Sequence, residues 1–244
     1  LVELMLLLQL DWQAQWQALA CFGMLLAVPA WCWLPRPPVE AFRAQPASRD
    51  RPPAKRFIRL MLASYFCAGY GYVISATFIV TIVERMDGLS GRGNVSFIIL
   101  GLAAAPAVMM WDVIARKTGY LKAIMLALLV QVMAILLPLW SGTLPVVLIS
   151  AALFGATFIG VVSLVLTMAG RLYPSKPAKL MGKMTLAYGS AQVIAPALTG
   201  YLAEVSGYYT LGLYLAAGFV GLGALLIAVL MVTDKNARHF DALS

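Results

Sequence analysis

The sequence of 244 residues is poor in charged side chains and contains only three cysteines and one histidine. Charged residues make up 11% of the chain, whereas soluble domains carry about 25%. Hydrophobic residues make up 62% of the chain, and apolar runs long enough to cross a bilayer recur along its whole length. This composition excludes an ordinary soluble domain and predicts an all-α membrane protein with several transmembrane helices.

The sequence also lacks the motifs of the common enzyme and metal-site classes. It contains no G-x-x-x-x-G-K-[ST] phosphate loop, no H-E-x-x-H zinc motif and no nucleophile elbow. Cys21, Cys32 and Cys67 lie inside apolar runs without zinc-ligand or disulfide spacing, and His239 lies in the polar C-terminal tail. We therefore expect no enzymatic activity, no cofactor and no bound metal.

The apolar runs predict seven membrane spans, at residues 14–34, 57–83, 94–114, 121–140, 145–169, 180–203 and 209–232. Residues 35–56, between the first two spans, are rich in proline and arginine, which is typical of a linker. Residues 233–244 form a polar tail. The chain begins on Leu1 without an initiator methionine, and its first ten residues lack the basic region of a signal peptide. We therefore expect residues 1–34 to be the end of a preceding half.

Basic residues gather in the connections on one side of the predicted membrane, whereas the other side carries only Arg85 and Arg92, beside Glu84 and Asp87. By the positive-inside rule, the basic side and the C-terminal tail are cytoplasmic. This topology accounts for the formal net charge of +8, so we expect no nucleic-acid partner. A lipid- or nucleic-acid-binding patch is the less favoured alternative. The basic side carries Arg36, Arg43, Arg49, Arg51, Lys55, Arg56, Arg59, Arg116, Lys117, Lys122, Arg171, Lys176, Lys179, Lys183, Lys235 and Arg238.

An internal repeat relates residues 57–144 to residues 145–232. Phe66, Gly101 and Gly119 recur as Phe154, Gly189 and Gly207, in each case 88 residues later. Each unit contains three spans, so the second unit enters the membrane with the opposite orientation. Such an inverted repeat is typical of secondary transporters.

The stretch from Met181 to Gly207 places polar groups in the middle of a span. Tyr188, Gln192, Ala195 and Thr199 form one stripe at helical spacing. An amide such as that of Gln192 is costly in lipid unless it faces protein or water, so this stripe is predicted to line a cavity. A neighbouring stripe of mostly small residues favours close approach of another helix: Gly189, Val193, Pro196 and Gly200.

Two further spans carry candidate lining residues. Tyr65 and Tyr72 share a face of the second span, well inside the membrane, and either line the cavity or pack between helices. Thr157 of the fifth span is a weaker candidate, because its glycine-rich surroundings favour helix packing. Glycines in the last span, which have no polar companions, also indicate packing.

The predicted spans contain no acid, lysine or histidine at mid-membrane depth. An ionised carboxylate there costs about 2.5–3.5 kcal/mol on insertion scales, so one would have marked a proton relay. Asp112 and Arg116 instead lie one turn apart near the cytoplasmic end of the third span. They form either a latch at a closing interface or a solvated helix end.

On these residues the chain resembles the C-terminal half of a major facilitator superfamily transporter, preceded by the sixth helix and the central cytoplasmic loop. The eleventh-helix pattern carries the clearest likeness, and the loop from Arg171 to Gly182 and the Asp11-Trp12 start of the first span add to it. Gly69-Tyr70-Gly71-Tyr72 resembles the YbfB/YjiJ-type bacterial branch. The eleventh-helix pattern consists of Gly189, Pro196, Gly200, Leu202 and Gly207.

The loop between the family's eighth and ninth helices often reads G-x-x-x-D-R-x-G. Here Lys117 and Gly119 match the end of that pattern, but Arg116 stands where the acid is expected and Asp112 takes the leading glycine position. The usual gating contact is therefore in doubt. Asp112, Arg116 and Lys117 are the gating candidates.

The resemblance implies a bacterial inner-membrane carrier that moves a small solute by alternating access, coupled to protons and directed toward efflux. It also implies a missing N-terminal six-helix half as partner, within the lipid bilayer. Two other classes stay open for seven spans, a seven-helix receptor and a membrane assembly subunit. A retinal protein would need a lysine in mid-span, and Lys183 lies at a helix start.

Overall fold

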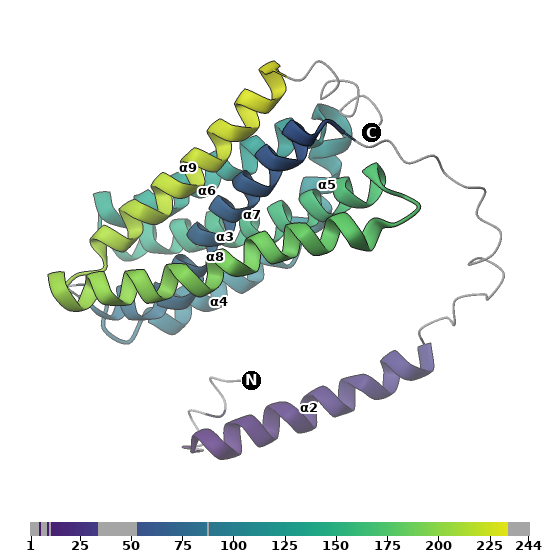
Figure 1. The fold of residues 1–244 in the computed structure, drawn as a ribbon. Helices are drawn as coiled ribbons and strands as arrows, with labels where there is room; N and C mark the ends of the chain where they lie inside the picture. The colour runs from purple at the N-terminus through teal and green to yellow at the C-terminus, as the bar shows by residue number, and fades with distance from the viewer. Residues whose placement is uncertain (1–4, 6–8, 10, 34–52, 87, 234–244) are drawn as a thin grey trace. The chain divides into compact units, whose positions relative to one another are not determined.

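The computed structural model describes residues 5, 9, 11–33, 53–86 and 88–233, whose regular secondary structure is entirely α-helical (Figure 1). The chain divides into two units, Leu1–Ala47 and Ser48–Ser244. The predicted all-α fold class is confirmed for the described residues. Most of the predicted linker and all but the first residue of the predicted tail lie outside them.

The described part of the first unit is mainly α2, Trp12–Trp33. Asp11 caps this helix, because its carboxylate accepts a hydrogen bond from the N–H of Ala14 at 2.9 Å. Exposed tryptophans lie near both ends of the helix, where their rings suit the membrane–water interface: Trp12, Trp16, Trp31 and Trp33. This helix agrees with the first predicted span, of which residue 34 lies outside the described residues.

The second unit is a helical bundle. Its elements are α3 (Lys55–Glu84), α4 (Gly93–Ala104), α5 (Ala107–Thr118), α6 (Tyr120–Trp140), α7 (Leu144–Leu172), α8 (Pro177–Ser206) and α9 (Thr210–Thr233). Five of these helices, α3 and α6 to α9, match predicted spans to within a few residues. The third predicted span is wrong as a single helix, because the chain forms α4 and α5 there with a bend of 44°.

The bend falls at Pro106, which has no N–H to continue the helical ladder. Both segments still pack on α7. Gly155 of α7 lies against the backbone of Leu100 in α4, and Gly160 lies against the ring of Trp111 in α5. The indole N–H of Trp111 also donates to the carbonyl of Ala156 at 2.6 Å. The bend therefore lets two straight segments follow one long partner helix.

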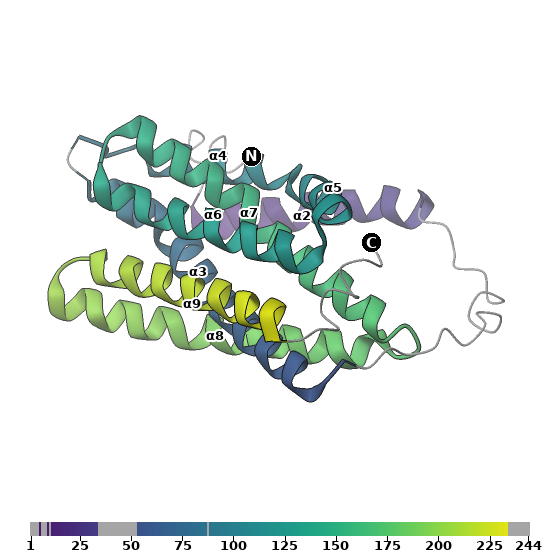
Figure 2. The same cartoon turned by 90° about the horizontal axis from the view of Figure 1, so that it is seen from above.

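The bundle consists of two groups of helices. In each group, the first helix of one predicted triplet packs with the remaining helices of the other triplet. Helices α3, α8 and α9 pack together, and α7 packs with α4, α5 and α6, while α6 and α9 join the groups. Figure 2 shows α8 and α9 on one side and α4 to α7 on the other. Exchanging the two predicted triplets maps each group onto the other. The inverted repeat requires this correspondence.

Individual contacts repeat in the same way. Ser64 of α3 donates a hydrogen bond to the carbonyl of Gly223 in α9 at 2.9 Å. Ser150 of α7 correspondingly donates to the carbonyl of Ala134 in α6 at 2.6 Å. In both triplets a serine on the first helix therefore binds the third helix of the other triplet.

The two glycines matched by the repeat end corresponding helices. Gly119 and Gly207 have φ angles of 96° and 77°, a region that strongly favours glycine. Their N–H groups donate to Ala115 and Ala203 at 2.8 and 2.9 Å, and these alanines are again 88 residues apart. The repeat therefore extends from side chains to backbone conformation.

Five described helices are long and apolar enough to cross a membrane, or six when α4 and α5 count as one span. Helix α8 is not among them, although it has 30 residues. The expectation that α8 is apolar enough by composition alone to cross a membrane is therefore wrong. Lys179, Lys183 and the polar residues in its middle lower its apolar character, and it joins the bundle by packing along α3.

Candidate functional site

A cluster of five aromatic rings connects α3, α7 and α8. We call it the aromatic cluster; it consists of Tyr65, Tyr72, Phe154, Phe158 and Tyr188. The ring of Tyr188 lies 4.6 Å from that of Tyr65 and 5.8 Å from that of Tyr72, between centroids. Tyr72 also stacks on Phe158 at 4.9 Å. Three of the predicted lining residues therefore meet at one place.

Gly69 explains how Tyr188 reaches both partners. It lies between Tyr65 and Tyr72 on one face of α3. A Cβ atom added to Gly69 would lie 2.6 Å from the backbone oxygen of Tyr188. The missing side chain thus lets α3 and α8 touch, and the Tyr188 ring fills the space between the two tyrosines.

The polar stripe of α8 turns toward the bundle. Ala195 and Thr199 are buried, and Tyr188 and Gln192 are half-buried. Gln192 follows Tyr188 by one turn and so lies beside the aromatic cluster on the same face. This arrangement agrees with the predicted stripe, although its role in binding a solute stays a prediction.

The neighbouring stripe of small residues does not contact the described bundle as expected. Beyond the adjacent part of α8 itself, no described atom lies within 4 Å of a Cβ added to Gly189 or Gly200, and Val193 is 77% exposed. The close approach between helices occurs at Gly69 instead. A glycine pattern alone cannot identify the helix that approaches it.

Two predicted lining residues lie in packed surroundings rather than in the aromatic cluster. Thr199 packs against Gly212 of α9, and its hydroxyl has no hydrogen-bond partner among the described residues. The hydroxyl of Thr157 donates to carbonyls of its own helix, Leu153 at 2.9 Å and Phe154 at 3.0 Å. Both threonines are buried.

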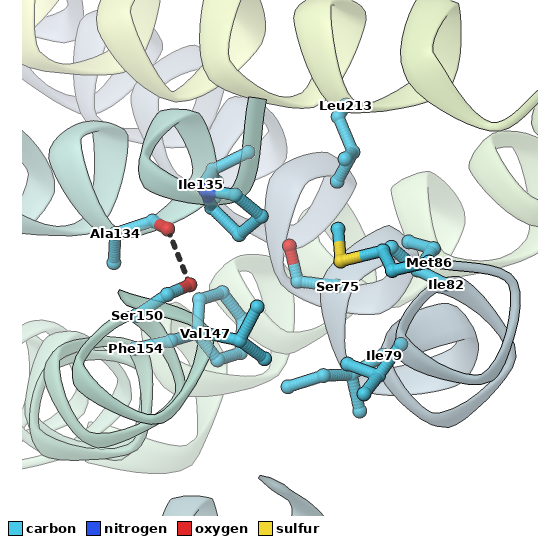
Figure 3. A pocket seen from close by; sticks show the side chains of 12 residues that line it. Ser75, Ile79, Ile82, Met86, Ala134, Ile135, Val147, Ser150, Phe154 and Leu213 are labelled. Atoms are coloured by element: carbon cyan, nitrogen blue, oxygen red, sulfur yellow. Dashed lines mark hydrogen bonds between the residues drawn. The ribbon is translucent and has the colours of Figure 1, made fainter. Parts of the chain in front are cut away.

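A small apolar cavity adjoins the aromatic cluster and shares Phe154 with it (Figure 3). Its volume of about 30 Å³ leaves room for little more than a water molecule. Figure 3 shows the hydroxyls of Ser75 and Ser150 on its wall. Ser150 donates a hydrogen bond to the carbonyl of Ala134, whereas Ser75 has no hydrogen-bond partner in the described part of the chain. In this conformation the rings of the cluster are packed against one another.

Sequence reasoning missed two residues of this site and one buried amide elsewhere in the bundle. Phe154 and Phe158 complete the aromatic cluster, and their spacing of four residues on one helix was the available signal. Gln131 is a buried amide in the middle of α6, and its side-chain oxygen has no hydrogen-bond partner among the described residues. A lone glutamine in an apolar run was its only signal.

The candidate latch forms an ion pair. Arg116 binds the carboxylate of Asp112 through Nε and a terminal nitrogen, both at 2.8 Å. The side chains of Arg116 and Asp112 are 65% and 36% exposed, and Lys117 is also exposed. Solvent therefore weakens this pair, and the gating role of the three residues stays a prediction.

Replacing Asp112 with asparagine tests that role. Because the pair is exposed, thermal stability should change little, by less than about 1 kcal/mol. A latch predicts that flux in the full-length protein changes at least twofold. A solvated helix end predicts unchanged flux, and that outcome would remove Asp112 from the gate. Solute flux in proteoliposomes, with thermal unfolding of the same preparation, distinguishes the two.

Comparison with known protein families agrees with the membrane-transporter architecture. A family model described as "Uncharacterised MFS-type transporter YbfB" matches residues 1–231. No curated protein matches the chain.

Proposed function

Because this chain belongs to the family of YbfB-type transporters of the major facilitator superfamily, we propose that it forms the C-terminal half of a secondary transporter working by alternating access. The family establishes a membrane transporter. Our proposal adds that residues 57–232 act as one rocking unit and that residues 1–34 belong to a preceding six-helix half. The two exchanged groups of helices support it, since inverted triplets permit such rocking.

The aromatic cluster and Gln192 carry the proposal for the solute site. Rings from three helices meet at Tyr188, and Gln192 lies one turn further along the same face of α8. Carriers of this architecture bind their solutes between such helices, near the middle of the bilayer. Tyrosine rings offer a large apolar surface with hydroxyl groups at its edge. Such a wall suits a small, partly apolar solute.

Proton coupling, efflux direction, a bacterial inner-membrane location and a cytoplasmic C-terminus complete the proposal. The basic residues support the orientation, and the resemblance implies the others. The predicted spans hold no acid at mid-membrane depth, so we place the coupling carboxylate in the preceding half. If transport is coupled to protons, a change that stops solute movement in the full-length protein should also stop proton movement.

Alternating access predicts a water-accessible position 192. In a full-length variant with its native cysteines replaced by alanine, a cysteine at Gln192 should react with a membrane-impermeant maleimide added from either side. A thiol needs water to ionise and react. Leu225→Cys is the matched control, because Leu225 lies on α9, is 58% exposed and neighbours the exposed apolar side chain of Leu222. It should react from neither side.

The rate of maleimide labelling shows whether position 192 is accessible to water and from which side of the membrane. Equal low reactivity at positions 192 and 225 would show that the Gln192 face is dry. Reactivity from one side alone, under every imposed gradient, would argue for a receptor or an assembly subunit rather than a carrier.

A further inference from the structure

A larger cavity lies at the opposite end of the bundle from the basic connections. Its volume is about 280 Å³, and it lies where α3 and α6 end and α9 begins. It shares no residue with the aromatic cluster. Its polar wall consists of Arg85, Tyr208, Tyr209, Thr210 and Tyr214.

Arg85 is held at this cavity by an aromatic ring. Its guanidinium carbon lies 5.1 Å from the ring centroid of Tyr209, within the range of a cation–π contact. The Tyr209 ring in turn packs on Phe78, with centroids 5.0 Å apart. A guanidinium that rests on a ring keeps its N–H donors for a ligand, and these donors match the oxygens of a phosphate.

The nearest described carboxylate does not neutralise Arg85. Glu84 accepts hydrogen bonds from the N–H groups of Gly91 at 2.6 Å and Gly93 at 2.8 Å. Within the described residues, Arg85 forms no salt bridge. Asp87 follows two positions later in the sequence and lies outside the described residues, so the experiment treats it separately.

The rest of the cavity is apolar and continues onto apolar helix faces. Ile82, Leu139 and Leu213 line it. The outward faces of α6 and α9 beside it carry exposed large hydrophobic side chains, including Leu129, Met133, Leu222 and Leu225. Exposed tyrosines at the rim are typical of the membrane–water interface.

We propose that this cavity binds the headgroup phosphate of an anionic phospholipid. Arg85 donates to the phosphate oxygens, the tyrosine hydroxyls contact the glycerol region, and the acyl chains lie along the apolar faces of α6 and α9. A phospholipid headgroup and free phosphate both present a phosphate anion to Arg85, so free phosphate is the alternative ligand. This site is independent of the proposed transport.

Photo-crosslinking in vesicles tests the lipid site. The chain is reconstituted into phosphatidylcholine vesicles containing a phosphatidylglycerol with a photoreactive group near its headgroup. Mass spectrometry should locate adducts on residues 207–214. Because Arg85→Gln removes direct charge-assisted hydrogen bonds to the phosphate, it should reduce these adducts at least about fivefold. Millimolar inorganic phosphate should leave them unchanged.

The matched control is Arg92→Gln, which removes an equal charge from the same end of the bundle but does not line the cavity. Its adducts should stay at the wild-type level. Tyr209→Phe keeps the ring under Arg85 and should retain the adducts, whereas Tyr209→Leu should lose them. Asp87→Asn should leave them unchanged or increase them.

Three outcomes would overturn the proposal. Equal losses in Arg85→Gln and Arg92→Gln would mean general charge attraction. Displacement by inorganic phosphate would mean a free-anion site. Equal adducts from a photoreactive phosphatidylcholine would mean that the anionic headgroup is not recognised.

Discussion

Replacing Gln192 with leucine in the full-length transporter is expected to lower solute flux at least about fivefold while the protein still folds. Gln192 is half-buried and lies one turn beyond Tyr188, beside the aromatic cluster. Leucine removes the amide but keeps a similar size. Loss of a hydrogen bond to a bound solute, leaving the solute's group unpaired, costs about 1–3 kcal/mol, and 1.4 kcal/mol is a factor of about ten. Flux in proteoliposomes, with a solute found by screening, measures the effect.

Tyr188→Leu should have a similar effect for another reason. Its ring contacts those of Tyr65 and Tyr72, and each aromatic pair contributes about 0.5–1.5 kcal/mol beyond its buried area. Tyr188→Phe keeps the rings together, so it separates the hydroxyl from the ring. Tyr214→Leu is the control, since Tyr214 is exposed on α9 away from the cluster. Normal flux in folded Gln192→Leu and Tyr188→Leu protein would remove both residues from the solute site.

Gly155→Ala is expected to destabilise the bundle by about 1–3 kcal/mol, the cost of overpacking a close contact. An added Cβ would overlap the backbone oxygen of Leu100 in α4. A backbone atom cannot turn aside as a flexible side chain can. Helices α4 and α7 must therefore separate, and Trp111 would lose its 2.6 Å hydrogen bond to Ala156 if α5 follows.

Thermal unfolding monitored by fluorescence-detected size-exclusion chromatography measures this loss. The matched control is Gly200→Ala, the same substitution inside α8 at a position where an added Cβ meets no described atom of another helix within 4 Å. It should leave the unfolding midpoint unchanged or raise it, because alanine favours the helix. A Gly155→Ala midpoint equal to that of Gly200→Ala would show that α4 and α7 are not in close contact.

The sequence by itself determined the helical class, the order of the helices and the bounds of all the predicted spans except the third, which is broken into α4 and α5. Those features follow from local patterns, since apolar runs and helical spacing do not depend on distant residues. The inward stripe with Tyr188 and Gln192 was predictable because four positions on one helix face turn together. The matched glycines 119 and 207 adopt a similar positive-φ conformation at corresponding helix ends, which the repeat alone did not predict.

The tertiary structure alone decided which surfaces meet. Pro106 interrupts a helix, whereas Pro196 lies within one. Gly69 receives Tyr188, whereas Gly189 and Gly200 face no neighbour in the described bundle. Phe154 and Phe158 contact Tyr72 because α7 packs beside α3, and the sequence alone does not reveal that packing. The reason is physical: a residue's local preference is fixed by its own chain, but a contact depends on the shape of a partner far away in sequence.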